Sequence, residues 1–235
     1  MLDCFGPTPF NAINFSKQVF TQMFNRHLRE PFSGLSHLFG ALLSLAAIPY
    51  MLVNTPDERF GSYLASYLVF GISMFLMFGS SAVYHLMEIS EAGIRALKRV
   101  DHMAIYVMIA GSYTPYCLIG LGGSQGWWMF GIVWGIALAG ILKKIFWLHA
   151  PRWFSTLLYL GMGWISMFVY EPLSESLSAG AINWLIAGGI SYSVGAVVYA
   201  TKWPNISKGF GFHELWHVFV LGGAACHFVS IAIYL

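Results

Sequence analysis

Seven stretches of the chain are long and apolar enough to cross a lipid bilayer, and this feature constrains the fold more than any other. A membrane-spanning helix needs about 20 predominantly apolar residues. The composition agrees, because 57% of the residues are hydrophobic and only 9% are charged, whereas soluble domains carry about 25% charged residues. The stretches are 32–53, 61–87, 101–121, 127–145, 153–170, 181–200 and 212–235. We therefore predict an all-α membrane protein in which residues 31–235 form one bundle of seven transmembrane helices.

Basic residues are distributed unevenly between the two sides that seven spans create. One side carries 11 of the 12 Lys and Arg residues, and the other carries Arg59 alone. Positive charge stays on the cytoplasmic side. We expect a cytoplasmic N-terminus and an external C-terminus, in the plasma (inner, cytoplasmic) membrane. Lys143 and Lys144 interrupt the end of the fourth span, but a lysine at a helix end can extend to the membrane interface.

Small residues indicate where the helices approach one another closely. They occur in "GIVWG" at 131–135, "GMG" at 161–163, "AGGIS" at 187–191 and "GGAA" at 222–225. Residues 1–30 form an N-terminal tail, which is either a short interfacial helix on the cytoplasmic surface or mobile. The net charge of +2 is too small to indicate a nucleic-acid partner, and the sequence does not identify an oligomeric state.

Ionisable residues within membrane spans are costly, so each marks a candidate functional position. Most of them fall near the cytoplasmic ends of their predicted spans, and His227 alone lies about 15 Å further along the last span. The residues at the cytoplasmic ends are His37, His85, Asp101, His102, His213, Glu214 and His217. Several spans thus bring imidazole and carboxylate groups to one depth.

The spacing of the histidines predicts a metal site. His213 and His217 lie four residues apart on one helical face, in "HELWH", which matches the HExxH pattern of zinc hydrolases. His85 supplies a third nitrogen if the second and seventh spans are neighbours, and catalytic zinc sites have three protein ligands plus a water. An HxxxH pair also arises by chance, and polar residues near span ends can be interfacial caps. The joint placement on one side is the stronger evidence.

Three segments resemble the marker segments of the hemolysin III family, within the wider progestin and adipoQ receptor (PAQR) superfamily, which includes the adiponectin receptors and is related to the alkaline ceramidases. They are "EPFSGLSH" at 30–37, "SSAVYHLMEISEAGIRALKRVDHMAIYVMIAGSYTP" at 80–115 and "HELWHVFV" at 213–220. The resemblance implies a seven-helix bundle with a cytoplasmic N-terminus and a zinc ion near the cytoplasmic face. It also implies His85, His213 and His217 as zinc ligands, with Asp101 and Ser81 beside the zinc-bound water.

Such a site suits hydrolysis of a membrane lipid. A zinc-bound water is a nucleophile at neutral pH, Asp101 can act as general base, and Ser81 can hydrogen-bond the water or the developing oxyanion. We expect zinc-dependent cleavage of a lipid amide or ester, similar to the ceramidase relatives. The alternatives are a receptor or sensor with structural zinc, and a pore-forming cytolysin. No span carries the continuous polar stripe that a channel needs.

Glu214 is a second candidate base, because the Glu of HExxH has that role in soluble zincins. It lies about 100° from the ligand face of the helix, where it can meet Lys208 or solvent. We therefore favour Asp101. His37 is expected to orient or pack beside the site, and His102 to face a neighbouring helix.

Overall fold

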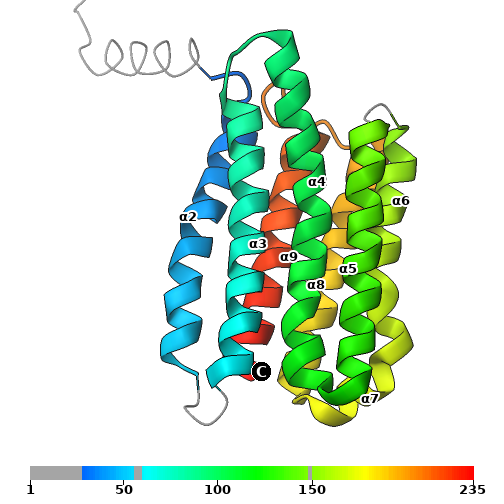
Figure 1. The fold of residues 1–235 in the computed structure, drawn as a ribbon. Helices are drawn as coiled ribbons and strands as arrows, with labels where there is room; N and C mark the ends of the chain where they lie inside the picture. Colours follow the sequence, from blue (N-terminus) through cyan, green and yellow to red (C-terminus); the bar gives the residue numbers. More distant parts are fainter. Residues whose placement is uncertain (1–27, 56–59, 148–149) are drawn as a thin grey trace, which may run out of the picture.

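The chain is helical in nearly all of the part that the computed structural model describes, which comprises residues 28–55, 60–147 and 150–235. The helices run side by side and alternate in direction (Figure 1). They are α2 (Pro31–Val53), α3 (Phe60–Leu86), α4 (Glu91–Pro115), the π-helix η2 (Tyr116–Leu121), α5 (Gly123–Phe146), α6 (Arg152–Gly163), the 3-10 helix η3 (Trp164–Val169), α7 (Tyr170–Ser176), α8 (Ala179–Thr201) and α9 (Phe212–Tyr234). The predicted interfacial helix of the tail falls outside the described residues.

Seven helical stretches are long and apolar enough to cross a membrane, which confirms the predicted seven-span bundle. Helices suit this setting because each satisfies its own backbone hydrogen bonds without water. The sequence also marks several helix starts. Pro31 occupies the first turn of α2, and the hydroxyl of Ser90 accepts the backbone N–H of Gly93 at 3.3 Å at the start of α4. Ser178 caps α8 in the same way, by accepting from Ala181 at 3.2 Å.

The third and fifth spans are less regular than the sequence predicts. Helix α4 begins at Glu91 rather than at residue 101, so the basic segment around Lys98 lies within its first turns. Beyond Pro115, which cannot donate a helical hydrogen bond, the third span continues as the π-helix η2. The fifth span changes from α6 to η3 at Trp164. Irregular helix of both kinds is common at functional positions.

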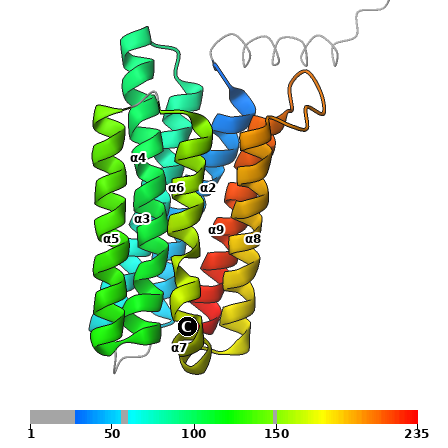
Figure 2. The same ribbon diagram turned by 90° about the vertical axis from the view of Figure 1, so that its right-hand side faces the viewer.

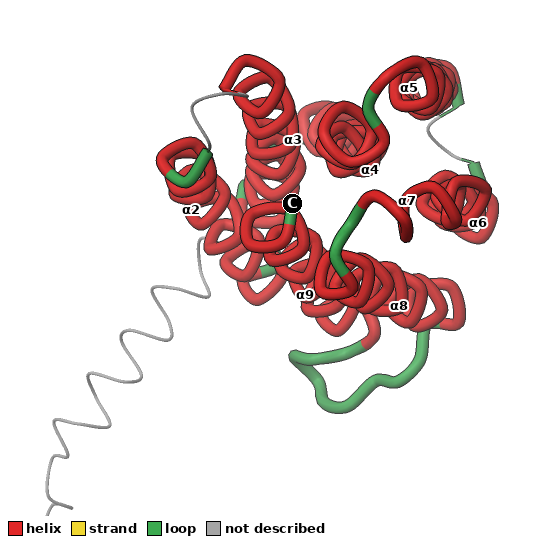
Figure 3. The backbone as a smooth tube through the Cα atoms, turned by 90° about the horizontal axis from the view of Figure 1, so that it is seen from below, coloured by secondary structure: helices red, strands yellow, loops and turns green. Residues whose placement is uncertain are grey.

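The bundle has one closely packed group of helices and one loosely packed side. Helix α2 packs against both α3 and α9, α3 packs further against α4, and α8 packs extensively against α9. The span formed by α6, η3 and α7 makes few close backbone contacts with its neighbours. Seen from the end of the bundle, α5 and α6 lie on the side away from α2 (Figure 3). The main cavity lies on this loosely packed side.

The small residues of α8 and α9 lie at close contacts between these two helices, as predicted. Gly188 of α8 lies against the ring of His227, and Gly223 of α9 lies against the ring of Tyr192. Neither position has room for a side chain. Glycine is therefore required at both positions for the two helices to pack this closely.

The same prediction is wrong for the segments 131–135 and 161–163. Their glycines are exposed and have open space beside them, and Gly163 lines the main cavity. On α5 the contacting glycines are instead Gly126, which lies against the backbone of Cys117 from η2, and Gly140, which lies against the ring of Tyr106 from α4. A glycine pattern indicates that a helix can be approached closely, but it does not indicate on which face.

Lys143 and Lys144, at the end of α5, take different directions. Lys143 is partly exposed, and its ammonium nitrogen lies 4.3 Å from the centre of the Phe154 ring. Lys144 is 2% exposed, and its Nζ donates to the hydroxyl of Ser155 at 3.0 Å. The expectation that these lysines extend to the membrane interface is therefore wrong for Lys144.

The distribution of charge predicts the orientation of the bundle in the membrane. The starts of α2, α4, α6 and α9 lie at one end together with the ends of α3, α5 and α8 (Figures 1 and 2), so basic residues such as Arg29, Lys98 and Lys208 share that end. Since positive charge stays cytoplasmic, a reporter fused after Leu235 is expected to be outside the cytoplasm. A reporter at Leu235 that proves cytoplasmic would contradict this orientation.

The Gly140 contact gives a test of the packing. A Gly140→Leu substitution would push into the Tyr106 ring, and overpacking of this kind costs about 1–3 kcal/mol. We expect a lower midpoint of thermal unfolding in detergent. The matched control is Gly135→Leu on the same helix, where the side chain enters open space and no loss is expected. Equal destabilisation by the two variants would show that the α4–α5 contact is not as described.

Candidate metal centre

Three imidazole side chains meet near one end of the bundle. His85 lies in the last turn of α3, and His213 and His217 lie one turn apart near the start of α9. Helix α2 packs against both α3 and α9. Gly40 of α2 fits closely between side chains from these two helices. Helix α2 thereby brings the end of α3 and the start of α9 to the same place.

The arrangement of the three rings suits a metal ion. One nitrogen atom from each ring lies within 4.8 Å of the other two. The ring centre of His85 is 5.1 Å from that of His213 and 4.7 Å from that of His217. His85 and His217 are each 2% exposed, while His213 is partly exposed. Neutral imidazole is a ligand for zinc, copper, iron and nickel, so the three predicted ligands form a site that can hold such an ion.

Glu30 belongs to this site, although it was not among the residues predicted from the sequence. Its Oε2 accepts a hydrogen bond from Nδ1 of His85 at 2.5 Å and lies 3.8 Å from Nδ1 of His213. Metal-binding histidines commonly donate one ring N–H to a carboxylate, which fixes the orientation of the ring. With Nδ1 of His85 donating to Glu30, the Nε2 lone pair of His85 is available for a metal.

Glu30 is held in place by several contacts. Its backbone N–H donates to the carbonyl of His85 at 3.0 Å, and its Oε1 lies 3.5 Å from Nε of Arg29. The hydrogen bond from His85 holds the pKa of Glu30 below its ordinary value, against the opposing effect of partial burial. One signal for Glu30 was present in the sequence, because it directly precedes Pro31 at the predicted start of the first span.

Ser81 and Asp101 lie beside the imidazoles. Ser81 is one turn before His85 on α3 and is 2% exposed, and Asp101 of α4 is 8% exposed. The Ser81 side chain interacts with the carboxylate of Asp101. Both residues line the same cavity as the three histidines. The structure therefore brings together all five residues that the sequence analysis selected.

Glu214 makes a different contact. Its Oε2 accepts the backbone N–H of Gly211 at 2.8 Å, at the start of α9, as a glutamate at the third position of a helix does in a capping box. This backbone partner takes the place of the expected contact with Lys208 or solvent. Glu214 does not line the cavity. Its carboxylate is therefore engaged in stabilising the start of the helix that carries His213.

The remaining described histidines have separate surroundings. His37 is 3% exposed, and its ring centre lies 3.9 Å from that of His217, so it packs beside the site. His102 lines the cavity. His227 is buried further along α9, where its Nδ1 hydrogen-bonds a backbone carbonyl four residues earlier at 2.9 Å. His27 and His149, for which we expected no role, lie outside the described residues.

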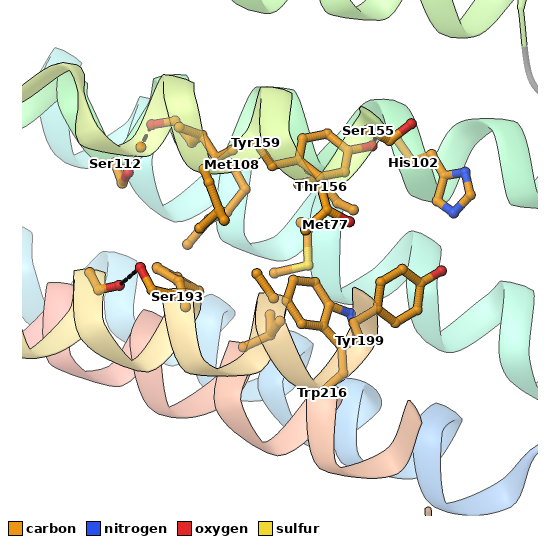
Figure 4. Close-up of a pocket in the computed structure, with 18 of the residues that line it drawn as sticks. Met77, His102, Met108, Ser112, Ser155, Thr156, Tyr159, Ser193, Tyr199 and Trp216 are labelled. Atoms are coloured by element: carbon orange, nitrogen blue, oxygen red, sulfur yellow. Dashed lines mark hydrogen bonds between the residues drawn. The ribbon is translucent and has the colours of Figure 1, made fainter. Parts of the chain in front are cut away.

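A cavity of about 720 Å³ opens from the imidazoles into the bundle. Figure 4 shows Ser155 and Tyr159 of α6 on one wall, and Tyr199 of α8 and Trp216 of α9 on the other. The lining extends along α9 as far as His227. The candidate metal centre thus faces a space much larger than a single water.

Known proteins are similar in sequence to this chain over most of its length. Residues 25–228 match the family described as "Haemolysin-III related". The chain is 37% identical over 203 residues to Hemolysin-3 of Bacillus cereus, which covers 86% of this chain and 90% of that protein. It is 38% identical over 202 residues to the Hemolysin-3 homolog of Bacillus subtilis (strain 168), covering 86% of this chain and 92% of the relative.

A more distant likeness reaches animal proteins. The Monocyte to macrophage differentiation factor of Homo sapiens is 26% identical over 171 residues, which cover 71% of this chain and 69% of the human protein. The family match over residues 25–228 includes the three clustered histidines, Asp101 and Ser81. The chain is a multi-pass membrane protein of the hemolysin III family, within the PAQR superfamily.

Proposed function

We propose that this protein is a zinc-dependent hydrolase that cleaves an amide or ester bond of a membrane lipid. The observation that carries the proposal is the cavity of about 720 Å³, which is lined by the three imidazoles and Asp101. A purely structural metal needs the same ligands but no space for a substrate. Ligand sites in proteins occupy about 300–1,000 Å³, so this cavity is large enough for a lipid chain.

The donor set favours zinc. Three histidines are one of the ligand sets that catalytic zinc uses, with a fourth position left open. In this proposal His85, His213 and His217 hold the ion, and Glu30 orients the His85 ring. When bound, zinc lowers the pKa of a coordinated water to about 7 and polarises a carbonyl oxygen.

Asp101 is the residue that we assign as general base. Its carboxylate lines the cavity beside the histidines, where it can take the proton of the attacking water and pass it to the leaving group. Ser81, which interacts with Asp101, can hold that carboxylate in position or donate to the developing oxyanion. Glu214 is poorly suited to the same role because its carboxylate is bonded to the backbone of Gly211.

A lipid substrate is supported by the outer edge of the cavity. Some of the side chains that line it are exposed, including Trp164 at 38%, Met167 at 56% and Ile186 at 38%. In this proposal they form the opening of the cavity toward the lipid chains of the membrane. An acyl chain can therefore pass from the bilayer into the cavity, with its polar end at the cytoplasmic side of the membrane, where the metal centre lies in the orientation proposed above.

The metal assignment predicts which substitutions release zinc. Replacing His85, His213 or His217 by Ala should remove most of the metal from the purified protein, as measured by elemental analysis. Glu30→Gln keeps the three ligands but weakens the acceptor for His85, and should lower zinc affinity by about 10- to 100-fold. Competition with a chelator would measure that loss.

The matched control is His227→Ala, which removes a buried histidine from the same helix as His213 and should leave the zinc content unchanged. Stoichiometric zinc in His213→Ala would refute the ligand assignment.

The assignment of the base predicts a contrast between two carboxylates. Asp101→Asn should lower lipid hydrolysis by about 100- to 10,000-fold while zinc stays bound. Glu214→Gln should retain most of the activity, with a small loss of stability from the weaker helix cap. Both would be assayed by release of fatty acid from a panel of acyl amides and esters.

The opposite contrast would make Glu214 the base and overturn the mechanism. If neither the parent protein nor the variants release fatty acid from any member of the panel, the metal would be structural. The protein would then belong to the second class considered from the sequence, a zinc-stabilised membrane receptor or sensor.

A further inference from the structure

Lys144 is a buried lysine on the wall of the main cavity. It lies near the end of α5, is 2% exposed and lines the cavity that contains the three imidazoles. Its Nζ donates to the hydroxyl of Ser155 at 3.0 Å, and Ser155 is presented by the first turns of α6 (Figure 4). The same hydroxyl lies 3.5 Å from Nζ of Lys143. One serine hydroxyl therefore stands beside two ammonium groups.

The charge of Lys144 has no direct counter-ion among the residues that the structure describes. No carboxylate oxygen of those residues lies within 4.0 Å of its Nζ. The two acidic residues that line the cavity have other partners: Glu30 bonds to His85, and Asp101 interacts with Ser81. An ammonium group has three donors, and an unpaired buried charge is strongly unfavourable.

Lys143 and Lys98 add positive charge near Lys144, and Asp101, the acidic residue that acts on this charge, lies beyond ion-pair distance. Lys98 of α4 also lines the cavity, is exposed, and makes no ion pair with a described residue. Arg95 lines it too but is paired with Glu91 at 3.4 Å. A basic wall thus stands in the same cavity as the candidate metal centre. An anion in the cavity would neutralise the charge that the protein leaves unpaired.

We infer that Lys144, with Ser155 and Lys98, binds a phosphate or carboxylate on the polar part of an acyl lipid that occupies the cavity. Hydrogen bonds from an ammonium to such an anion are stronger than bonds between neutral groups. The inference rests on the proposed function for the identity of the cavity as a lipid site, and it narrows the substrate class. The substrate is an acyl lipid with an anionic polar part rather than a neutral amide or ester.

Lys143 provides a matched control for this site. It has the same chemistry and is the adjacent residue, but its ammonium lies over the rings of Phe154 and Trp147, at 4.3 Å and 5.7 Å from their centres. It does not line the cavity. Removing the charge of Lys143 changes the total charge of the protein as much as removing that of Lys144. It removes only the longer contact with Ser155, at 3.5 Å, and keeps the 3.0 Å contact between Lys144 and Ser155 on the cavity wall.

The test is ligand-induced thermal stabilisation of the purified full-length protein in dodecyl maltoside, with the metal removed by a chelator. The probes are dodecyl phosphate, dodecanoate, neutral dodecanol and inorganic phosphate. We expect at least one of the two anionic amphiphiles to raise the midpoint of thermal unfolding of the parent and of Lys143→Met. Dodecanol should leave this midpoint unchanged. In Lys144→Met the apparent affinity should fall about tenfold or more, because a hydrogen bond to a charged group is lost.

The unliganded variants separate a binding role from a structural one. Lys144→Met should fold and be as stable as the parent or more so, since it removes an unpaired buried charge. If it does not fold, Lys98→Met serves instead, because Lys98 is exposed and its loss should weaken anion binding while the fold is kept. The inference is overturned if the anionic probes stabilise the tested variant, Lys144→Met or its substitute Lys98→Met, as much as they stabilise the parent.

The remaining outcomes distinguish the sources of the anion. Stabilisation by inorganic phosphate as strong as that by dodecyl phosphate would overturn the lipid assignment and indicate a site for free anions. Equal stabilisation by dodecanol would also overturn it, since the chain alone would then account for binding. Because no probe is hydrolysed and no metal is bound, anion binding can be established in a protein that hydrolyses nothing. Failure of the proposed reaction therefore remains separable from failure of this inference.

Discussion

A polar side chain in a membrane span is stable only where other protein groups or an enclosed cavity receive it, and this constraint governs how the helices of this protein are turned. The cost of an unsatisfied polar group in hydrocarbon is several kcal/mol. His85, His217 and Asp101 are accordingly buried, and all three line one cavity. The outer surface of the bundle carries the large apolar side chains. The polar centre and the apolar exterior both follow from the lipid bilayer acting as the solvent.

Helix α2 connects this constraint to the geometry of the centre. It contacts both α3 and α9, and at its start Glu30 hydrogen-bonds the imidazole of His85 and approaches that of His213. A carboxylate in this place orients the ring that it accepts from. The first span therefore contributes none of the three clustered imidazoles but packs against the two helices that carry them. The Pro31 that follows Glu30 fixes where the helix begins.

The loosely packed side of the bundle has a different role. Closely packed helices leave no room for a ligand, and the contacts of α2, α3, α8 and α9 are of this kind. The span that contains α6 and η3 packs less closely, and the cavity lies between it and α4, α8 and α9. The change from α-helix to 3-10 helix at Trp164 is on this side. The closely packed helices thus hold the imidazoles in position, and the loosely packed side provides space for a ligand.

The sequence by itself determined the helical class and the number of spans, and it predicted the three histidines, Ser81 and Asp101 of the centre but not Glu30. Span number follows from the length of apolar segments, because the thickness of the hydrocarbon core is fixed. The selection of His85, His213 and His217 follows from the cost of placing imidazoles in lipid, which leaves few explanations for several of them at one depth. The span number needs only composition and position along the chain, whereas the ligand set and the places of Asp101 and Ser81 also drew on the resemblance to the hemolysin III family.

Only the tertiary structure decided the direction of individual side chains and the residues that they contact. Glu30 hydrogen-bonds His85 in the centre, and Glu214 accepts from the backbone at the start of α9. Lys144 points into the bundle, whereas Lys143 lies over the ring of Phe154. Adjacent residues on a helix differ by about 100° in direction, so a one-residue step separates the cavity from the lipid. That direction depends on how each helix is rotated against its neighbours, and contacts between segments far apart in the chain set this rotation.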